Sequence, residues 1–219
     1  MRVILFGATG MVGQGVLREC LLDGDVKAVL SIVRGKTGQQ RAKLRELVHT
    51  NFLSYAGLES VLSGYDVCLF CLGVSSAGMR EEDYRRITYG FTLAAAEALA
   101  RLNPAMTFIY VSGAGTDSSE RGRVMWARVK GATENALLRL PFQAAYMFRP
   151  AMIVPLHGIV SRTAIYRIPY KILGPLLPWL YRRFPKYVTT TEKLGRAMLA
   201  AAKGRASKAV FENLDINRQ

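Results

Sequence analysis

A glycine-rich turn at residues 7–13, with the sequence GATGMVG, most constrains how this chain can fold. The apolar run 2–6 precedes the turn, and apolar residues recur at helical spacing over 16–22 after it. In a strand, turn and helix of this kind, glycines let the backbone approach a pyrophosphate, and the helix N-terminus supplies N–H groups and a positive dipole end. The motif therefore predicts a dinucleotide-binding unit, and a turn that serves packing alone is the alternative.

The rest of the chain alternates short apolar runs with helical patterns. We expect strands at 26–33, 44–48, 67–72, 107–111, 144–148 and 210–212, and helices at 81–103, 124–140 and 190–202. Such alternation is typical of a parallel sheet with helices on both faces. The predicted fold class is α/β, a Rossmann-type doubly wound parallel sheet in one domain, residues 1–219. Prolines and aromatic residues punctuate 156–188, where we expect a small C-terminal cap over the carboxyl edge of the sheet.

The positive charge is confined to the second part of the chain. Residues 121–219 hold 18 of the 30 Lys and Arg residues against 4 acids, whereas residues 1–120 are neutral overall. This distribution favours an anionic partner or substrate, although a solvated basic face has the same composition.

Basic and aromatic residues are interleaved over residues 165–187, a pattern that suits the headgroup region of an anionic membrane. A substrate-pocket lid or a homodimer surface fits the same pattern, because prolines interrupt any continuous amphipathic helix. Nucleic-acid binding is the least favoured hypothesis, since the segment contains no recognised reading motif.

The residue that follows the second expected strand bears on the choice of dinucleotide. An NAD-preferring site places Asp or Glu there, about 20 residues beyond the glycines, to bind the ribose 2′-hydroxyl. Here the position is Arg34, and Asp23 and Asp25 lie before the strand, at its other end. A guanidinium pairs with phosphate oxygens in bidentate fashion, so Arg34 favours the 2′-phosphate of NADP.

Three cysteines, an odd number, argue against a secreted disulfide framework and favour a reducing compartment, with the cytoplasm as the default location. We expect neither a targeting segment nor a membrane-spanning helix. Cys68 and Cys71 should point to opposite faces of a strand, so they cannot form a redox or zinc pair. His49 and His157 lack the neighbouring ligand spacing of a metal site, and we predict none.

Five segments carry a resemblance to a known family. They are GATGMVG at 7–13, DVCLFCLG at 66–73, FIYVSGAG at 108–115, WARVKGATEN at 126–135 and FRPAMIVP at 148–155. Together they resemble the short-chain dehydrogenase/reductase superfamily, in its atypical, epimerase/dehydratase-like branch that includes the Tat-interacting oxidoreductase group. The segment KYVTTTEKLGRAML at 186–199 also looks like the closing helix of that family. The resemblance says little about the substrate.

The resemblance implies a cofactor site at the carboxyl edge of the sheet. Its residues would be Gly7, Thr9, Gly10, Met11, Val12, Gly13, Arg34, Asn51, Leu72, Gly73, Lys130, Pro150, Met152 and Ile153. By this resemblance the backbone N–H groups of Met11 and Val12 bind the pyrophosphate, and Asn51 lies near the adenine. The pair 72–73 lines the adenosine, and the segment 150–153 flanks the nicotinamide carboxamide.

The catalytic set that the resemblance implies contains Ser112, which would orient a substrate carbonyl, and Lys130, which would hold the nicotinamide ribose. Four residues before the lysine the family has a tyrosine, whose phenol transfers the proton once the lysine has lowered its pKa. This chain has Trp126 there, and an indole N–H does not titrate. Thr88 also stands where many relatives have asparagine. Three tyrosines could substitute, and the sequence selects none of them: Tyr84, Tyr89 and Tyr146.

These features predict an NADP(H)-binding oxidoreductase or epimerase that acts on a small anionic or hydrophobic molecule. The retained Ser112 and Lys130 favour the enzyme. A non-catalytic NADP(H) sensor, which presents its basic face to a partner, is the alternative that Trp126 favours.

Overall fold

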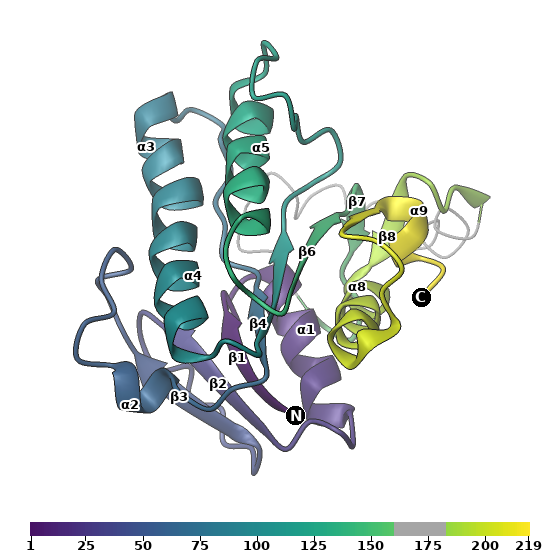
Figure 1. Ribbon diagram of the computed structural model, residues 1–219. Coiled ribbons are helices and arrows are strands. Elements are labelled where there is room, and N and C mark those ends of the chain that lie inside the picture. Colours follow the sequence, from purple (N-terminus) through teal and green to yellow (C-terminus); the bar gives the residue numbers. More distant parts are fainter. Residues whose placement is uncertain (160–182) are drawn as a thin grey trace.

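The computed structural model describes residues 1–159 and 183–219, and it places a parallel sheet between two layers of helices (Figure 1). In this part of the chain seven strands form the main sheet in the order β3-β2-β1-β4-β5-β6-β9, with every pair parallel. They are β1 (Arg2–Phe6), β2 (Ala28–Val33), β3 (Leu44–Val48), β4 (Val67–Phe70), β5 (Thr107–Val111), β6 (Ala144–Arg149) and β9 (Val210–Glu212). The strand order reverses between β1 and β4, and ligands of open α/β sheets commonly bind at the carboxyl ends of the strands at such a point. The predicted doubly wound α/β fold is confirmed.

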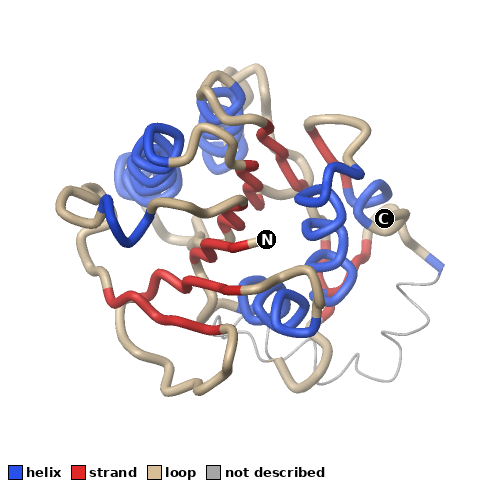
Figure 2. Tube along the Cα trace, turned by 60° about the horizontal axis from the view of Figure 1, so that its bottom comes forward, coloured by secondary structure: helices blue, strands red, loops and turns tan. Residues whose placement is uncertain are grey.

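Helices cover both faces of this sheet (Figure 2). On one face, α1 (Met11–Leu22) packs against α8 (Thr191–Ala200). A Cβ at Gly15 would lie 2.6 Å from Cβ of Thr191, so this close crossing of the two helices depends on glycine. On the other face lie α4 (Phe91–Leu102) and α5 (Met125–Leu138), which run side by side in Figure 1.

Alternate residues of the central strands enter two separate cores. Val67 and Leu69 of β4 belong to the core under α1 and α8, whereas Cys68 and Phe70 belong to the core under α4. A strand that is buried on both faces reads as a continuous apolar run, as β4 does. Cys71 packs against the first core, so the prediction that Cys68 and Cys71 point to opposite faces is confirmed.

The helix expected at 81–103 consists of three consecutive segments, namely α3 (Glu81–Arg85), a π-helical turn η1 (Arg86–Gly90) and α4. Several short elements were not predicted: α2 (Glu59–Leu62), β7 (Met152–Val154), β8 (Val188–Thr190), the π-helical turn η3 (Ala201–Arg205) and α9 (Asn213–Ile216). β7 and β8 pair in parallel although about 35 residues separate them in sequence. A three-residue strand is too short to show a period, so only the pairing identifies it.

The cap predicted at 156–188 lies largely outside the described residues, which include only its ends, 156–159 and 183–188. Most of the segment 165–187 falls in the same gap, so the membrane, lid and homodimer hypotheses for it stay predictions. At the described end, Phe184 and Tyr187 are exposed, with Arg183 and Lys186 over their respective rings. Among the described helices, none has the length and apolar character required to cross a bilayer.

Candidate functional site

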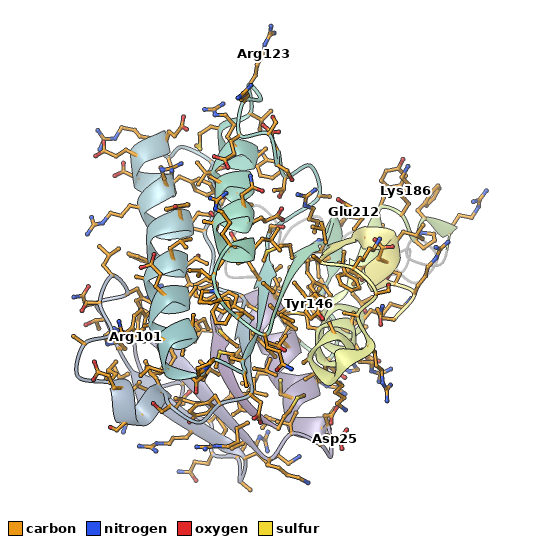
Figure 3. All side chains as sticks on the ribbon, in the orientation of Figure 1. Asp25, Arg101, Arg123, Tyr146, Lys186 and Glu212 are labelled. Atoms are coloured by element: carbon orange, nitrogen blue, oxygen red, sulfur yellow. The ribbon has the colours of Figure 1, made fainter. Side chains whose placement is uncertain are left out.

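The residues predicted for the site follow the carboxyl ends of six neighbouring strands. In the order of β1 to β6, they are Gly7, Arg34, Asn51, Leu72, Ser112 and Pro150. Because the strands are parallel, these residues share one edge of the sheet. In Figure 3 Arg123, in the loop before α5, marks this edge, and Arg101 at the end of α4 marks the opposite one.

The glycine turn fits closely against neighbouring backbone. Gly7 has a φ of +79°, and a Cβ there would lie 2.6 Å from backbone atoms of Cys71 and Leu72. A Cβ at Gly13 would collide with the carbonyl of Gly7, which accepts the N–H of Gly10 at 2.9 Å. Side chains at these positions would therefore displace the turn from the end of β4.

The N-terminus of α1 begins in this turn and has no capping side chain. Gly10 is the N-cap and offers no side chain, and the first turn of the helix has no acid. The first N–H groups of a helix have no intrahelical acceptor, and they carry the positive end of its dipole. The Thr9 carbonyl accepts the side-chain amide of Gln14 at 3.2 Å, which holds the start of the helix in place. A pyrophosphate fits these residues, because the cradle is one that a Cβ would fill and the N–H groups require an acceptor.

The residues predicted for the adenosine side lie at the surface of this edge. Arg34 is exposed directly after β2, whereas Asp23 and Asp25 bind Lys203 at 2.7 Å and 2.6 Å before that strand begins. Asn51 is exposed, and its Oδ1 accepts the N–H of Leu53 at 3.3 Å. Leu72 is partly buried and Gly73 exposed.

The segment after β6 is tied to the segment after β5. The carbonyl of Pro150 accepts the N–H of Ala114 at 2.9 Å. Met152 donates its N–H to the carbonyl of Tyr187 at 3.0 Å, and its side chain is exposed. Ile153 packs against the core under α1 and α8. These contacts hold the loops of β5 and β6 together at the carboxyl edge.

The hydroxyl of Ser112 donates to a buried carboxylate. Ser112 is 7% exposed, and its Oγ lies 2.5 Å from Oε1 of Glu134, which is 1% exposed. The same carboxylate binds Arg149, with 2.5 Å between Oε2 and Nη2, and Arg149 also contacts Ser118 at 2.6 Å and Glu212 at 3.2 Å. A serine has one O–H, so this hydroxyl has no proton left to donate to a substrate carbonyl.

Lys130 also lies beside Ser112. It stands on the same face of α5 as Glu134, four residues before it. Its Nζ donates to the backbone carbonyl of Ser112. Burial lowers the pKa of Lys130 to about 8, and the nearby Glu134 carboxylate partly opposes this shift. The ammonium therefore loses its proton within the range in which enzymes are commonly assayed.

The depressed pKa of Lys130 predicts a pH-dependent stability. The folded pKa is about 8 and the reference value is 10.5, so between these values the unfolded chain holds a proton that the native chain has lost. Stability therefore rises with pH across this window. We expect urea midpoints to rise between about pH 8 and about pH 10 in the wild type relative to Lys130→Met. Lys186→Met, which removes an exposed lysine, is the matched control, and a Lys130→Met profile parallel to the wild type would contradict the assignment.

Trp126 stands in the first turn of α5 with its ring against the loop that follows β5. A Cβ at Gly115 would lie 3.5 Å from Cη2 of the indole, and one at Gly113 would lie 4.0 Å from Cζ3. Gly115 has a φ of +86°, a conformation that favours glycine. Trp126 is only partly buried, so some of its ring surface remains accessible at the edge of the sheet.

The three alternative tyrosines lie on elements other than α5, so none has the one-turn spacing from Lys130 that the family pattern requires. Tyr84, in α3, is buried, and burial raises its pKa. The ring of Tyr89 lies under the guanidinium of Arg85, 4.6 Å away. Tyr146 is in the middle of β6, where its ring packs against Phe211, and Figure 3 shows it well below the carboxyl edge.

The sequence analysis missed Glu134 and Arg149 as members of this site. A signal was present, because Glu134 is the single acid among residues 121–191 and lies four residues after Lys130. The two histidines make local contacts instead: His49 Nε2 with the carbonyl of Ser54 at 2.9 Å, and His157 Nε2 with Glu192 at 2.5 Å.

The fold and the glycine cradle define a nucleotide-binding protein of the Rossmann type. A family model, described as the NAD dependent epimerase/dehydratase family, matches residues 3–121, more than half of the chain. The chain therefore belongs to this NAD(P)-binding family, in agreement with the resemblance to the atypical short-chain dehydrogenases.

Several curated proteins match this chain at low sequence identity. Protein FMP52, mitochondrial, from Eremothecium gossypii is 28% identical over 156 residues, which are 70% of this chain and 67% of the relative. The protein of the same name from Meyerozyma guilliermondii is 25% identical over 211 residues, 92% of this chain and 85% of the relative. Both are named as mitochondrial proteins, which contradicts the cytoplasmic location expected from the cysteine count. An odd number of cysteines indicates a reducing environment and does not distinguish among reducing compartments.

Solved structures share the fold. The UDP-N-acetylglucosamine 4-epimerase from Methanobrevibacter ruminantium superposes with a TM-score of 0.70 at 14% identity, covering 96% of this chain and 74% of that one. The Bordetella bronchiseptica enzyme WbmH, solved with NAD+, has a TM-score of 0.65 at 16% identity, with the same coverage of 96% and 74%.

Proposed function

We propose that the chain binds NADP(H) along the carboxyl edge of its sheet and acts as an oxidoreductase or epimerase on a small molecule. The observation that carries this proposal is the uncapped N-terminus of α1 above a glycine cradle that has no room for a Cβ. An anion is the natural occupant of such a place. The proposal is also supported by the family of the chain, whose members bind NAD or NADP.

Different residues of the chain would bind different parts of the cofactor. The N–H groups of Met11 and Val12 bind the pyrophosphate, Arg34 the 2′-phosphate, and Lys130 the nicotinamide ribose. When bound, the nicotinamide supplies a hydride donor or acceptor. Ala114 and Pro150 tie together the loops on either side of the reacting centre through their hydrogen bond at 2.9 Å.

The preference for NADP is tested at Arg34. NADPH should bind at least several-fold more tightly than NADH, because a guanidinium pairs with the 2′-phosphate. Arg34→Ala should remove most of that difference, whereas Arg101→Ala, at the opposite edge of the sheet, should leave it unchanged. Isothermal calorimetry measures both affinities. Equal affinities in the wild type, or a preference for NADH, would overturn the assignment.

A second function, that of a non-catalytic NADP(H) sensor, is favoured by two observations. Trp126 offers no titrating group, and the Ser112 hydroxyl donates its hydrogen bond to Glu134, with 2.5 Å between Oγ and Oε1. A sensor would bind NADPH with the preference set by Arg34, and it would not oxidise NADPH whichever acceptor is added. A panel of aldehydes, ketones, nucleotide sugars and quinones, followed by NADPH absorbance, distinguishes the sensor from the enzyme.

A further inference from the structure

The candidate site lacks the phenol that would donate a proton at the place where a carbonyl would be reduced. The indole of Trp126 does not titrate, and the hydroxyl of Ser112 donates to Glu134. Lys130 is the only ionisable side chain of the predicted catalytic set. One N–H group of its ammonium is taken by the Ser112 carbonyl, and the proposed function assigns the others to the nicotinamide ribose. Reduction of an aldehyde or ketone forms a strongly basic alkoxide, which requires an acid in the transition state. Simple carbonyl compounds therefore suit this site poorly.

The same site contains an aromatic side chain, that of Trp126, which is only partly buried. The six-membered ring of the Trp126 indole lies along the loop 113–115, where Gly113 and Gly115 contribute backbone without side chains. Aromatic rings prefer offset stacking, and an electron-poor ring gains most from stacking on an electron-rich indole.

We propose that this site takes a planar quinone as its hydride acceptor, stacked on the indole of Trp126. The inference rests on the proposed function, because it requires bound NADPH. The quinone accepts one hydride, that is two electrons and a proton, from the reduced nicotinamide, and it then takes a second proton from water. A hydroquinone and NADP+ result. The negative charge formed on the quinone oxygen is delocalised over the ring, so the reaction needs no acid from the protein.

Lys130 completes the site for this chemistry. It lies one helical turn after Trp126 on the same face of α5, so its ammonium stands on the side of the helix that bears the indole. A positive charge there stabilises the anion that forms before the proton arrives from water.

The experiment uses the full chain with Trp179→Phe, which leaves Trp126 as the single remaining tryptophan of the two. Menadione, a flat naphthoquinone, is titrated in the presence of NADP+, and the fluorescence of Trp126 is followed. We expect saturable quenching by menadione, whereas benzaldehyde should give no saturable change. Free N-acetyltryptophanamide supplies the collisional control, whose quenching rises without saturation.

Turnover provides the second readout. NADPH oxidation with menadione should be faster than with benzaldehyde by about 10²-fold or more, because only benzaldehyde requires the missing acid. Trp126→Ala should lower kcat/KM for menadione by about tenfold through loss of stacking, while Trp126→Phe, which keeps an aromatic ring, should lose little. Phe142→Leu removes a ring that packs on Phe108 just before β6, at the opposite edge of the sheet, and should leave the reaction unchanged.

The outcomes separate this inference from the proposed function. Calorimetry on the same samples reports NADPH binding directly, so failure to bind NADPH would overturn the proposed function. Tight NADPH binding without saturable menadione quenching would overturn the quinone proposal alone. Benzaldehyde reduction as fast as menadione reduction, or full menadione activity in Trp126→Ala, would also overturn it.

Discussion

Trp126→Tyr should raise the NADPH-dependent reduction of aldehydes and ketones by about 10²-fold or more, within the range that general acid catalysis typically supplies. The substitution places a phenol one helical turn before Lys130, on the same face of α5, and the ammonium lowers the phenol pKa by stabilising the phenolate. Steady-state assays with a panel of carbonyl substrates measure the gain. NADPH affinity should stay nearly unchanged, because the cofactor cradle lies at the start of α1.

Trp126→Phe is the matched control, since it makes the same change in ring size without the hydroxyl, and it should give no such gain. For Trp126→Tyr to show this gain, the Ser112 hydroxyl must also rotate away from Glu134 before it can donate to a substrate carbonyl. A wild-type protein that already reduces carbonyl compounds briskly, and continues to do so after Ser112→Ala and Lys130→Ala, would show that the chemistry takes place elsewhere.

The second large effect concerns the ion pair between Glu134 and Arg149. Their side chains are 1% and 13% exposed, and the closest oxygen and nitrogen atoms are 2.5 Å apart. Glu134→Ala leaves the guanidinium without its buried partner, a change that typically lowers the free energy of unfolding by about 3–5 kcal/mol. We expect a value toward the lower end, since Arg149 keeps Ser118 and Glu212. Urea unfolding measures it.

Glu212→Ala is the internal control for this pair. Glu212 also binds Arg149, at 3.2 Å, but its side chain is 52% exposed, so loss of this ion pair should cost less than about 1 kcal/mol. The side chain also caps α9, and loss of that cap should add about 1 kcal/mol. The double variant Glu134→Ala with Arg149→Met should be more stable than Glu134→Ala alone, because it removes the unpaired charge. If Glu134→Ala cost no more than Glu212→Ala, the buried ion pair would have no special role.

Much of the site could be read from local features of the sequence. The glycine turn, the all-buried strand at 67–70 and the alternation of strands with helices each depend on neighbouring residues, so periodicity reveals them. Parallel strands place the residues that follow them at one edge of the sheet, and Arg34 could be assigned to that edge from its position after the second strand. Ser112 and Pro150 could be assigned to the site only through the resemblance to the family.

The sequence by itself determined the sheet, the cradle of glycines and the absence of a phenol at Trp126. Only the tertiary structure decided what the Ser112 hydroxyl does. Glu134 follows it by 22 residues and Arg149 by 37, and the packing of α5 beside β5 and β6 brings all three into contact. The pairing of β7 with β8 is of the same kind. Such contacts join residues distant in the chain, and no local pattern encodes them, because their free energy comes from burial and charge pairing that exist only once the sheet has formed.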